Sequence, residues 1–194
     1  MPPLKQVRAV YDVETITVYQ AYGPDIAVPA VLAGRFVSPF SRSRMTWIKP
    51  SFLWMMYRSG WATKPGQERV LAIRITRAGF EEALASACLT HFDPDAYPTH
   101  EAWQACLDTS PVRVQWDPER SVSLAPLAYR SIQVGLGGSA ALRYVDDWIV
   151  SIDDITERVS RLRNSALSDS TELPQEVPYP LPDPVAMRVG ATAT

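Results

Sequence analysis

The sequence of 194 residues has few of the residues that build metal sites or disulfides. It contains two cysteines, Cys88 and Cys106, and two histidines, His91 and His100, and these do not have the spacing of a zinc or redox motif. Both cysteines fall in segments that we predict to be helical, so we expect buried free thiols and no metal. The alternative, a disulfide between them, needs an oxidising compartment.

Long apolar runs are also absent. No run approaches the roughly 18 residues of a membrane-spanning helix, and the opening segment MPPLKQVRAVYD lacks the apolar core of a signal peptide. We therefore expect a cytoplasmic protein that does not contact a membrane.

The chain has no phosphate loop of the form G-x-x-x-x-G-K-[ST], no G-x-G-x-x-G after a strand and no G-x-S-x-G nucleophile elbow. The glycines of VGLGGSA, residues 134–140, are better explained by a tight turn than by a phosphate cradle. With two histidines, neither of them beside a nucleophile in the sequence, a serine or cysteine hydrolase is disfavoured.

The length predicts one domain with a tail rather than two domains. We expect a single α+β domain over residues 1–168, with a mixed or antiparallel sheet, because strands and helices do not alternate strictly. Residues 169–194 are rich in proline and predict a flexible, extended tail to which a protein partner could bind.

Within the domain, the strands are expected to begin with a β-hairpin formed by QVRAVYD and TITVYQAY. Further strands are expected at 69–76 and 111–117, and a strand or helix at 129–136. Apolar spacing and capping residues predict helices at 25–34, 50–60, 79–92, 101–108, 137–145 and 153–167. For 50–60 a strand is the alternative, because a short apolar run is compatible with either element.

Acidic residues are nearly missing from one part of the chain. From Ile26 to Phe80 there is one acid, Glu68, against nine cations, although the formal net charge of the whole chain is −2. Either acids from the C-terminal half balance this charge across the fold, or the segment forms an anion-binding face. The cations are Arg35, Arg42, Arg44, Lys49, Arg58, Lys64, Arg69, Arg74 and Arg77.

The stretch RMTWIKPSFLWMMYRSGW, residues 44–61, combines this charge with aromatic rings. The free N–H groups at the start of the helix expected at 50–60 attract anions, and Arg44 and Lys49 add charge at the same end. Arg58 shares a helix face with Trp54, and an arginine stacked on an indole gains about 0.5–2 kcal/mol and can still bind a phosphate.

Indole faces also stack on nucleobases. The stretch therefore predicts a wall that binds a nucleotide, a dinucleotide or single-stranded nucleic acid. The alternative is that Trp47, Trp54 and the methionines only fill the core.

The strings VRAVYDVETITVYQAY, RMTWIKPSFLWMMYRSGW, LAIRITRAGFE and YRSIQVGL resemble an uncharacterised bacterial and fungal family catalogued as domain of unknown function 4291, over roughly residues 5–165. This resemblance implies no activity. A more distant one is informative: ITVYQAYGPDIAVPAVLAGRF and WMMYRSG…QERVLAIRITRAGF are similar to the first two blocks of ADP-ribosyltransferase-like folds.

That second resemblance implies a split sheet, NAD as cofactor and three catalytic positions. Gln20 stands where that family has a ribose-binding histidine, and Tyr57 where it has the aromatic residue that stacks on nicotinamide. Glu119 is the candidate for the glutamate that stabilises the transition state, with Gln115 and Gln133 as alternatives.

The resemblance and the basic wall together give a set of candidate ligand-binding residues. A non-catalytic module that binds a nucleotide or nucleic acid is the alternative function, because it needs only the wall. The candidate cofactor-binding residues are Arg8, Arg44, Trp47, Lys49, Trp54, Arg58 and Gln133.

Overall fold

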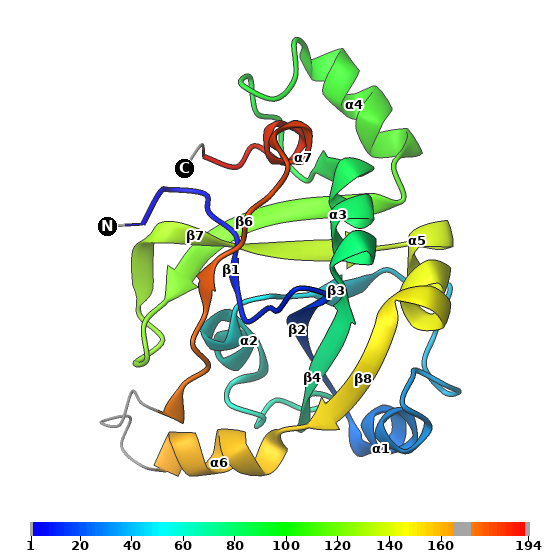
Figure 1. Cartoon of the computed structure of the whole chain (residues 1–194), viewed down its shortest axis with the longest axis vertical. Coiled ribbons are helices and arrows are strands. Elements are labelled where there is room, and N and C mark those ends of the chain that lie inside the picture. The colour runs from blue at the N-terminus through cyan, green and yellow to red at the C-terminus, as the bar shows by residue number, and fades with distance from the viewer. Residues whose placement is uncertain (1, 165–171, 193–194) are drawn as a thin grey trace.

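The computed structural model describes residues 2–164 and 172–192, and their fold is α+β (Figure 1). One sheet has three antiparallel strands in the order β2-β4-β8: β2 (Thr15–Tyr22), β4 (Arg69–Thr76) and β8 (Ile149–Asp154). Ile16, Val18, Ile73 and Ile75 alternate along β2 and β4 and are buried, as the period of a half-buried strand requires.

A second sheet has four strands in the order β3-β7-β6-β5 and is mixed, because β5 runs parallel to β6. Its strands are β3 (Thr46–Ile48), β5 (Ala87–Leu89), β6 (Val112–Arg120) and β7 (Pro126–Leu136). A short backbone bridge connects the two sheets: the Tyr19 N–H donates to the Lys49 carbonyl at 2.7 Å, and the Lys49 N–H donates to the Tyr19 carbonyl at 3.2 Å.

The helix expected in the basic stretch is present as α2 (Phe52–Ser59). Ser51 caps its start, because the side-chain oxygen accepts a hydrogen bond from the Trp54 N–H at 3.1 Å. Gly60 ends it with a φ of 60°, a conformation that favours glycine. Its buried side chains include Phe52, and they pack on β2 and on α6 (Thr156–Asn164).

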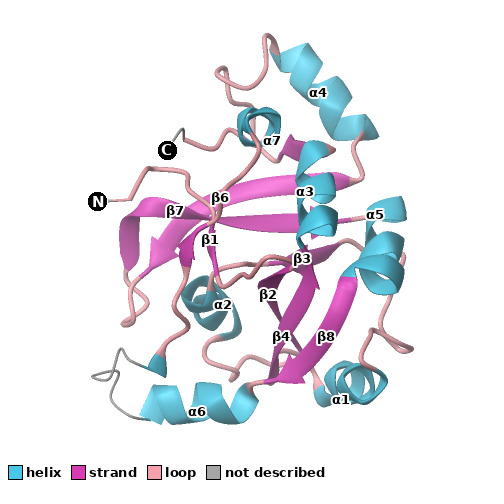
Figure 2. Ribbon diagram, in the orientation of Figure 1, coloured by secondary structure: helices cyan, strands magenta, loops and turns pink. Residues whose placement is uncertain are grey.

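The remaining helices lie around the sheets (Figure 2). Helix α1 packs against β2, β4 and β8, and α3 against β2, β4 and β6. Helix α5 continues into a π-helix at Tyr144–Trp148. These helices are α1 (Pro24–Ala33), α3 (Arg77–Ala85), α4 (His100–Thr109) and α5 (Gly138–Arg143).

Several expected elements differ in the structure. The helix expected at 79–92 ends at Ala85, and the chain continues into β5, where Cys88 is buried beside β6. Cys88 is therefore on a strand, Cys106 is on α4 as expected, and both are free thiols. The helix expected from residue 153 begins only at Thr156, because the preceding residues form β8 along β4.

The N-terminal strand does not form the expected hairpin. A single bridge joins Tyr11 to Ile16, but β1 (Arg8–Ala9) pairs with β9 (Val177–Pro178), far along the chain. Strand β2 instead pairs with β4 along its whole length. Turn residues near Asp12 do not decide the strand partners, which depend on distant contacts.

Residues 172–192 are part of the fold and not the flexible tail expected from residue 169. Strand β9 pairs with β1, and helix α7 (Asp183–Arg188) packs against α3. Tyr179 and Val189 are buried, and the Trp116 Nε1–H donates to the Val189 carbonyl at 2.7 Å. Apolar side chains between the prolines therefore bind this segment to the domain. The start of the expected tail, residues 169–171, lies outside the described residues.

Over the described ranges, no helix combines the length and the apolar character that crossing a membrane requires.

Candidate functional site

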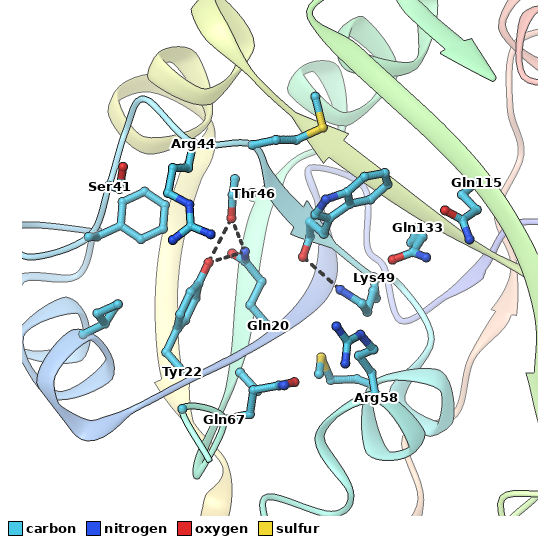
Figure 3. A pocket seen from close by; sticks show the side chains of 17 residues that line it. Gln20, Tyr22, Ser41, Arg44, Thr46, Lys49, Arg58, Gln67, Gln115 and Gln133 are labelled. Atoms are coloured by element: carbon cyan, nitrogen blue, oxygen red, sulfur yellow. Dashed lines mark hydrogen bonds between the residues drawn. The ribbon is translucent and has the colours of Figure 1, made fainter. Parts of the chain in front are cut away.

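A cavity of about 600 Å³ lies where β2, β3 and α2 meet (Figure 3). Its walls combine cations, amides, hydroxyl groups and apolar side chains, and none of the described residues that line it is acidic. The polar and charged side chains around it are Gln20, Tyr22, Ser41, Arg44, Thr46, Lys49, Arg58, Gln67, Gln115 and Gln133.

Three cations of the basic segment face this cavity: Arg44 precedes β3, Lys49 follows it, and Arg58 projects from the last turn of α2 (Figure 3). Within residues 2–164 and 172–192, none of the three forms an ion pair. Their charge is therefore available to an anion that enters the cavity.

Other cations of the same segment are neutralised by acids. Arg42 pairs with Asp146, Arg69 with Asp154 at 3.1 Å, Arg74 with Asp12 at 2.7 Å, and Arg77 with Glu81 at 3.8 Å. The interpretation that acids of the C-terminal half balance the basic segment thus holds for Arg42 and Arg69, whereas Arg74 and Arg77 are neutralised by acids from the N-terminal half. It fails for the three cations in the cavity.

Lys49 is the most buried of the cavity cations, with 5% of its surface exposed. Its Nζ donates to the Trp47 carbonyl at 3.1 Å. Burial, reinforced by the nearby Arg58 guanidinium, lowers the pKa of the amine to about 7, and the Asp117 carboxylate opposes this only in part. A substantial share of the Lys49 amines is therefore uncharged at neutral pH.

Gln20 is held in a polar network beneath the cavity. Its Nε2 donates to the Tyr22 hydroxyl at 2.8 Å and to Thr46 Oγ1 at 2.6 Å, while its Oε1 accepts from the Tyr144 hydroxyl at 2.6 Å. Burial raises the pKa of Tyr22 to about 12, so its hydroxyl stays protonated. The amide of Gln20 is therefore a fixed part of the wall, and three side chains set its orientation.

Two further amides are oriented by one carboxylate. Asp117 accepts from Gln115 Nε2 at 2.8 Å and from Gln133 Nε2 at 2.7 Å. Each of these amides has a second N–H and a carbonyl oxygen beyond these bonds. The cavity therefore offers both donors and acceptors on the side formed by β6 and β7 (Figure 3).

The Trp47 indole lies against β7 at Gly135, the residue that it faces in the pairing of β3 with β7. A Cβ atom added to Gly135 would lie 3.0 Å from both Cε2 and Cη2 of the indole and 2.8 Å from Sδ of Met45, so a larger residue would displace one of these side chains. One side of the ring thus packs on the sheet, and the residue also lines the cavity.

The cavity brings together six of the ten residues that the sequence indicated: Gln20, Arg44, Trp47, Lys49, Arg58 and Gln133. The other four, Arg8, Trp54, Tyr57 and Glu119, do not line it.

Tyr57 and Trp54 lie on another side of α2. Their rings stack with centroids 5.2 Å apart, and the Arg120 guanidinium lies 3.6 Å from the Tyr57 centroid and 5.3 Å from that of Trp54. The arginine that stacks on Trp54 is therefore Arg120 from β6. The expected partner, Arg58, lines the cavity instead.

Glu119 belongs to a cluster at the start of α2. Burial raises the pKa of its carboxyl group, whereas hydrogen bonds from the Arg120 backbone, Ser51 and Ser131 act in the opposite direction. The hydrogen bonds of Glu119 therefore connect β6 and β7 to the residue that caps α2.

Glu176 and Arg8 complete this cluster. The Glu176 side chain accepts from the Phe52 N–H at 2.6 Å, and Arg8 donates to the Glu176 carbonyl at 2.9 Å. Burial and the neighbouring Glu119 raise the pKa of the Glu176 carboxyl group to about 8. These contacts join the C-terminal segment to the helix, which gives Arg8 and Glu119 structural roles.

Sequence reasoning missed Tyr22, Thr46, Gln67 and Asp117. Tyr22 follows Gln20 by two residues on a predicted strand, so the shared face was a usable signal. Asp117 lies behind the wall, and it reaches the cavity-lining Gln133 only through the pairing of β6 with β7, which no local pattern indicates. The part of the chain that the structure describes contains no group of three or more His, Cys, Asp or Glu residues placed to hold a metal.

The family model described as Domain of unknown function (DUF4291) matches residues 6–180. The chain belongs to the DUF4291 family. No curated protein matches the sequence. Membership of the DUF4291 family assigns no activity to the chain.

Proposed function

We propose that this cavity binds a phosphorylated ligand of the nucleotide type. The observation that carries the proposal is that Arg44, Lys49 and Arg58 surround one cavity without an acid among its described lining residues. Its volume of about 600 Å³ falls within the range of about 300–1,000 Å³ that is usual for small-molecule sites.

Each part of such a ligand has a matching group in the wall. Arg44 and Arg58 bind phosphate oxygens, and arginine does so with two parallel hydrogen bonds. The indole of Trp47 stacks on a base, which contributes about 1–3 kcal/mol. Gln115 and Gln133, oriented by Asp117, hydrogen-bond to the edge of the base or to sugar hydroxyl groups.

The geometry supports binding more than ADP-ribosyl transfer. Of the three catalytic positions that the distant resemblance implies, Gln20 lines the cavity, whereas Tyr57 and Glu119 lie elsewhere. NAD therefore enters the proposal as one candidate ligand among nucleotides, and nucleic acid as a longer ligand of the same chemistry.

Isothermal titration calorimetry with ATP, NAD and a short single-stranded oligonucleotide tests the proposal. Arg44→Gln and Arg58→Gln each remove a charge-assisted bond of about 1.5–3 kcal/mol, so each should weaken binding about 10- to 100-fold. Arg35→Gln is the matched control, because Arg35 is an exposed cation of the same segment outside the cavity.

Binding should also weaken as salt increases. The proposal fails if none of the three ligands binds, or if Arg44→Gln and Arg58→Gln bind as tightly as the Arg35→Gln control.

A further inference from the structure

We infer that Lys49 forms an imine with the carbonyl carbon of a phosphorylated reducing sugar held in the cavity. This inference rests on the proposed function, because the same arginines hold the phosphate. It adds a covalent step and narrows the ligand to a sugar phosphate that can open to an aldehyde or a ketone.

Lys49 differs from the other two lysines of the chain. Lys5 forms an ion pair with Asp93 at 2.7 Å, and the exposed Lys64 donates to two backbone carbonyls. Lys49 is buried, lines the cavity and donates to one backbone carbonyl, that of Trp47. It is the lysine whose amine a cavity ligand can reach while bulk water is largely excluded.

The surroundings of Lys49 favour the uncharged amine, which is the nucleophilic form. The Arg58 guanidinium on α2 disfavours a second positive charge beside it, and burial acts in the same direction. The opposing group is Asp117 on β6, whose carboxylate oxygens accept hydrogen bonds from the two glutamine amides. The pKa of about 7 leaves a large share of free amine at neutral pH.

The same walls define the substrate class. An uncharged amine reacts with an electrophile such as a carbonyl carbon, and the guanidinium groups of Arg44 and Arg58 bind an anion. The amides of Gln115 and Gln133 suit sugar hydroxyl groups. A sugar with a carbonyl at one end and a phosphate at the other, such as a pentose 5-phosphate, satisfies all three requirements.

The step is balanced without any oxidant or reductant. The Nζ lone pair of Lys49 attacks the carbonyl carbon, the C=O π electrons move to the oxygen, and a proton passes from nitrogen to that oxygen. The resulting carbinolamine loses one water molecule as the C=N bond forms. One amine and one open-chain sugar phosphate therefore give one imine and one water molecule.

Reductive trapping tests the inference. The protein is incubated with ribose 5-phosphate and sodium cyanoborohydride, and the adduct is located by peptide mass spectrometry. We expect one adduct on Lys49, with at least about tenfold less on Lys5 and Lys64, because of the three lysines it is Lys49 that lines the cavity, where a bound sugar phosphate is held close to the amine. Ribose without phosphate should label Lys49 at least about tenfold less, since it lacks the charged bonds to the arginines.

Two lysine variants serve as controls. Lys49→Arg keeps the positive charge but has no nucleophilic amine, so it should lose the adduct, whereas Lys64→Arg should keep it. The labelling rate at Lys49 should rise with a midpoint near pH 7, well below the value of about 10.4 for an ordinary lysine.

The outcomes separate this inference from the proposed function. If ribose 5-phosphate binds in calorimetry but leaves no adduct on Lys49, or if the three lysines are labelled equally, the imine is overturned and the phosphate site stands. If neither ribose 5-phosphate nor any of the nucleotides binds, both proposals are overturned.

Discussion

Replacing Lys49 by methionine should make the protein more stable. Folding lowers the pKa of this amine from about 10.4 in an unfolded chain to about 7. At about 1.4 kcal/mol for each pH unit, the buried lysine costs the folded state roughly 4–5 kcal/mol at and below neutral pH. Lys49→Met removes this cost and loses the hydrogen bond to the Trp47 carbonyl, worth about 1 kcal/mol. We expect a net gain of about 2–4 kcal/mol at neutral pH.

The pH dependence of this gain identifies its cause. Between about pH 10.4 and pH 7 the unfolded chain binds a proton at Lys49 and the folded protein does not, so wild-type stability falls as the pH falls. Below pH 7 both states bind the proton, and the difference between variant and wild type becomes constant. The advantage of Lys49→Met should therefore shrink by about 2 kcal/mol from about pH 7 to about pH 9.

Urea denaturation of both proteins at these two pH values measures the effect, and Lys64→Met, which replaces an exposed lysine outside the cavity, is the matched control. A Lys49→Met protein less stable than the wild type at neutral pH, or one with the same advantage at both pH values, would refute the reasoning. A confirmed gain would mean that the chain keeps a destabilising lysine, as functional sites often do.

Three further changes should alter the free energy of unfolding, measured in each case by chemical denaturation. Glu176→Gln keeps an acceptor for the Phe52 N–H and removes a carboxyl group whose pKa folding raises to about 8. Because wild-type stability is lost as the pH rises from about 4 to 8, the variant should gain about 4 kcal/mol at pH 8 and nothing at pH 4. Tyr179→Ala should cost about 3–5 kcal/mol, since a buried ring of the C-terminal segment is lost; a cost below about 1 kcal/mol would contradict the packing described here. Gly79→Ala should cost about 1–3 kcal/mol although alanine favours helices, because its Cβ would lie 2.3 Å from Cγ of Trp148; a stabilised variant would be the contrary result.

The parts of the fold that the sequence predicts are those with local signals. Ser51 and Gly60 bound α2, and Gly34 ends α1 with a φ of 65°, because capping depends on neighbouring residues only. The sequence also predicts the cations of the cavity, because a run of positive charges without acids must be neutralised or solvated. Their convergence on one cavity follows because β3 and α2 lie close together in the sequence.

What the sequence did not predict depends on contacts between distant segments. Strands β5 and β8 are short and adjoin helical residues, so only their pairing with β6 and β4 defines them. Arg120 takes the place beside Trp54 that helix spacing assigned to Arg58, because β6 crosses α2. Proline content suggested a free tail, but side chains such as Tyr179 bury enough surface to hold that segment on the domain.

The bridge between Tyr19 and Lys49 has a mechanical consequence. It joins two sheets that otherwise have separate ladders, and the cavity takes Gln20 from one sheet and Gln133 from the other. A molecule that touches both walls acts as a brace across this joint, so occupancy should slow amide hydrogen exchange at Tyr19 and Lys49 more than elsewhere in β2. Slower exchange at these two amides would mean that ligand binding is also a change in stiffness between the two sheets.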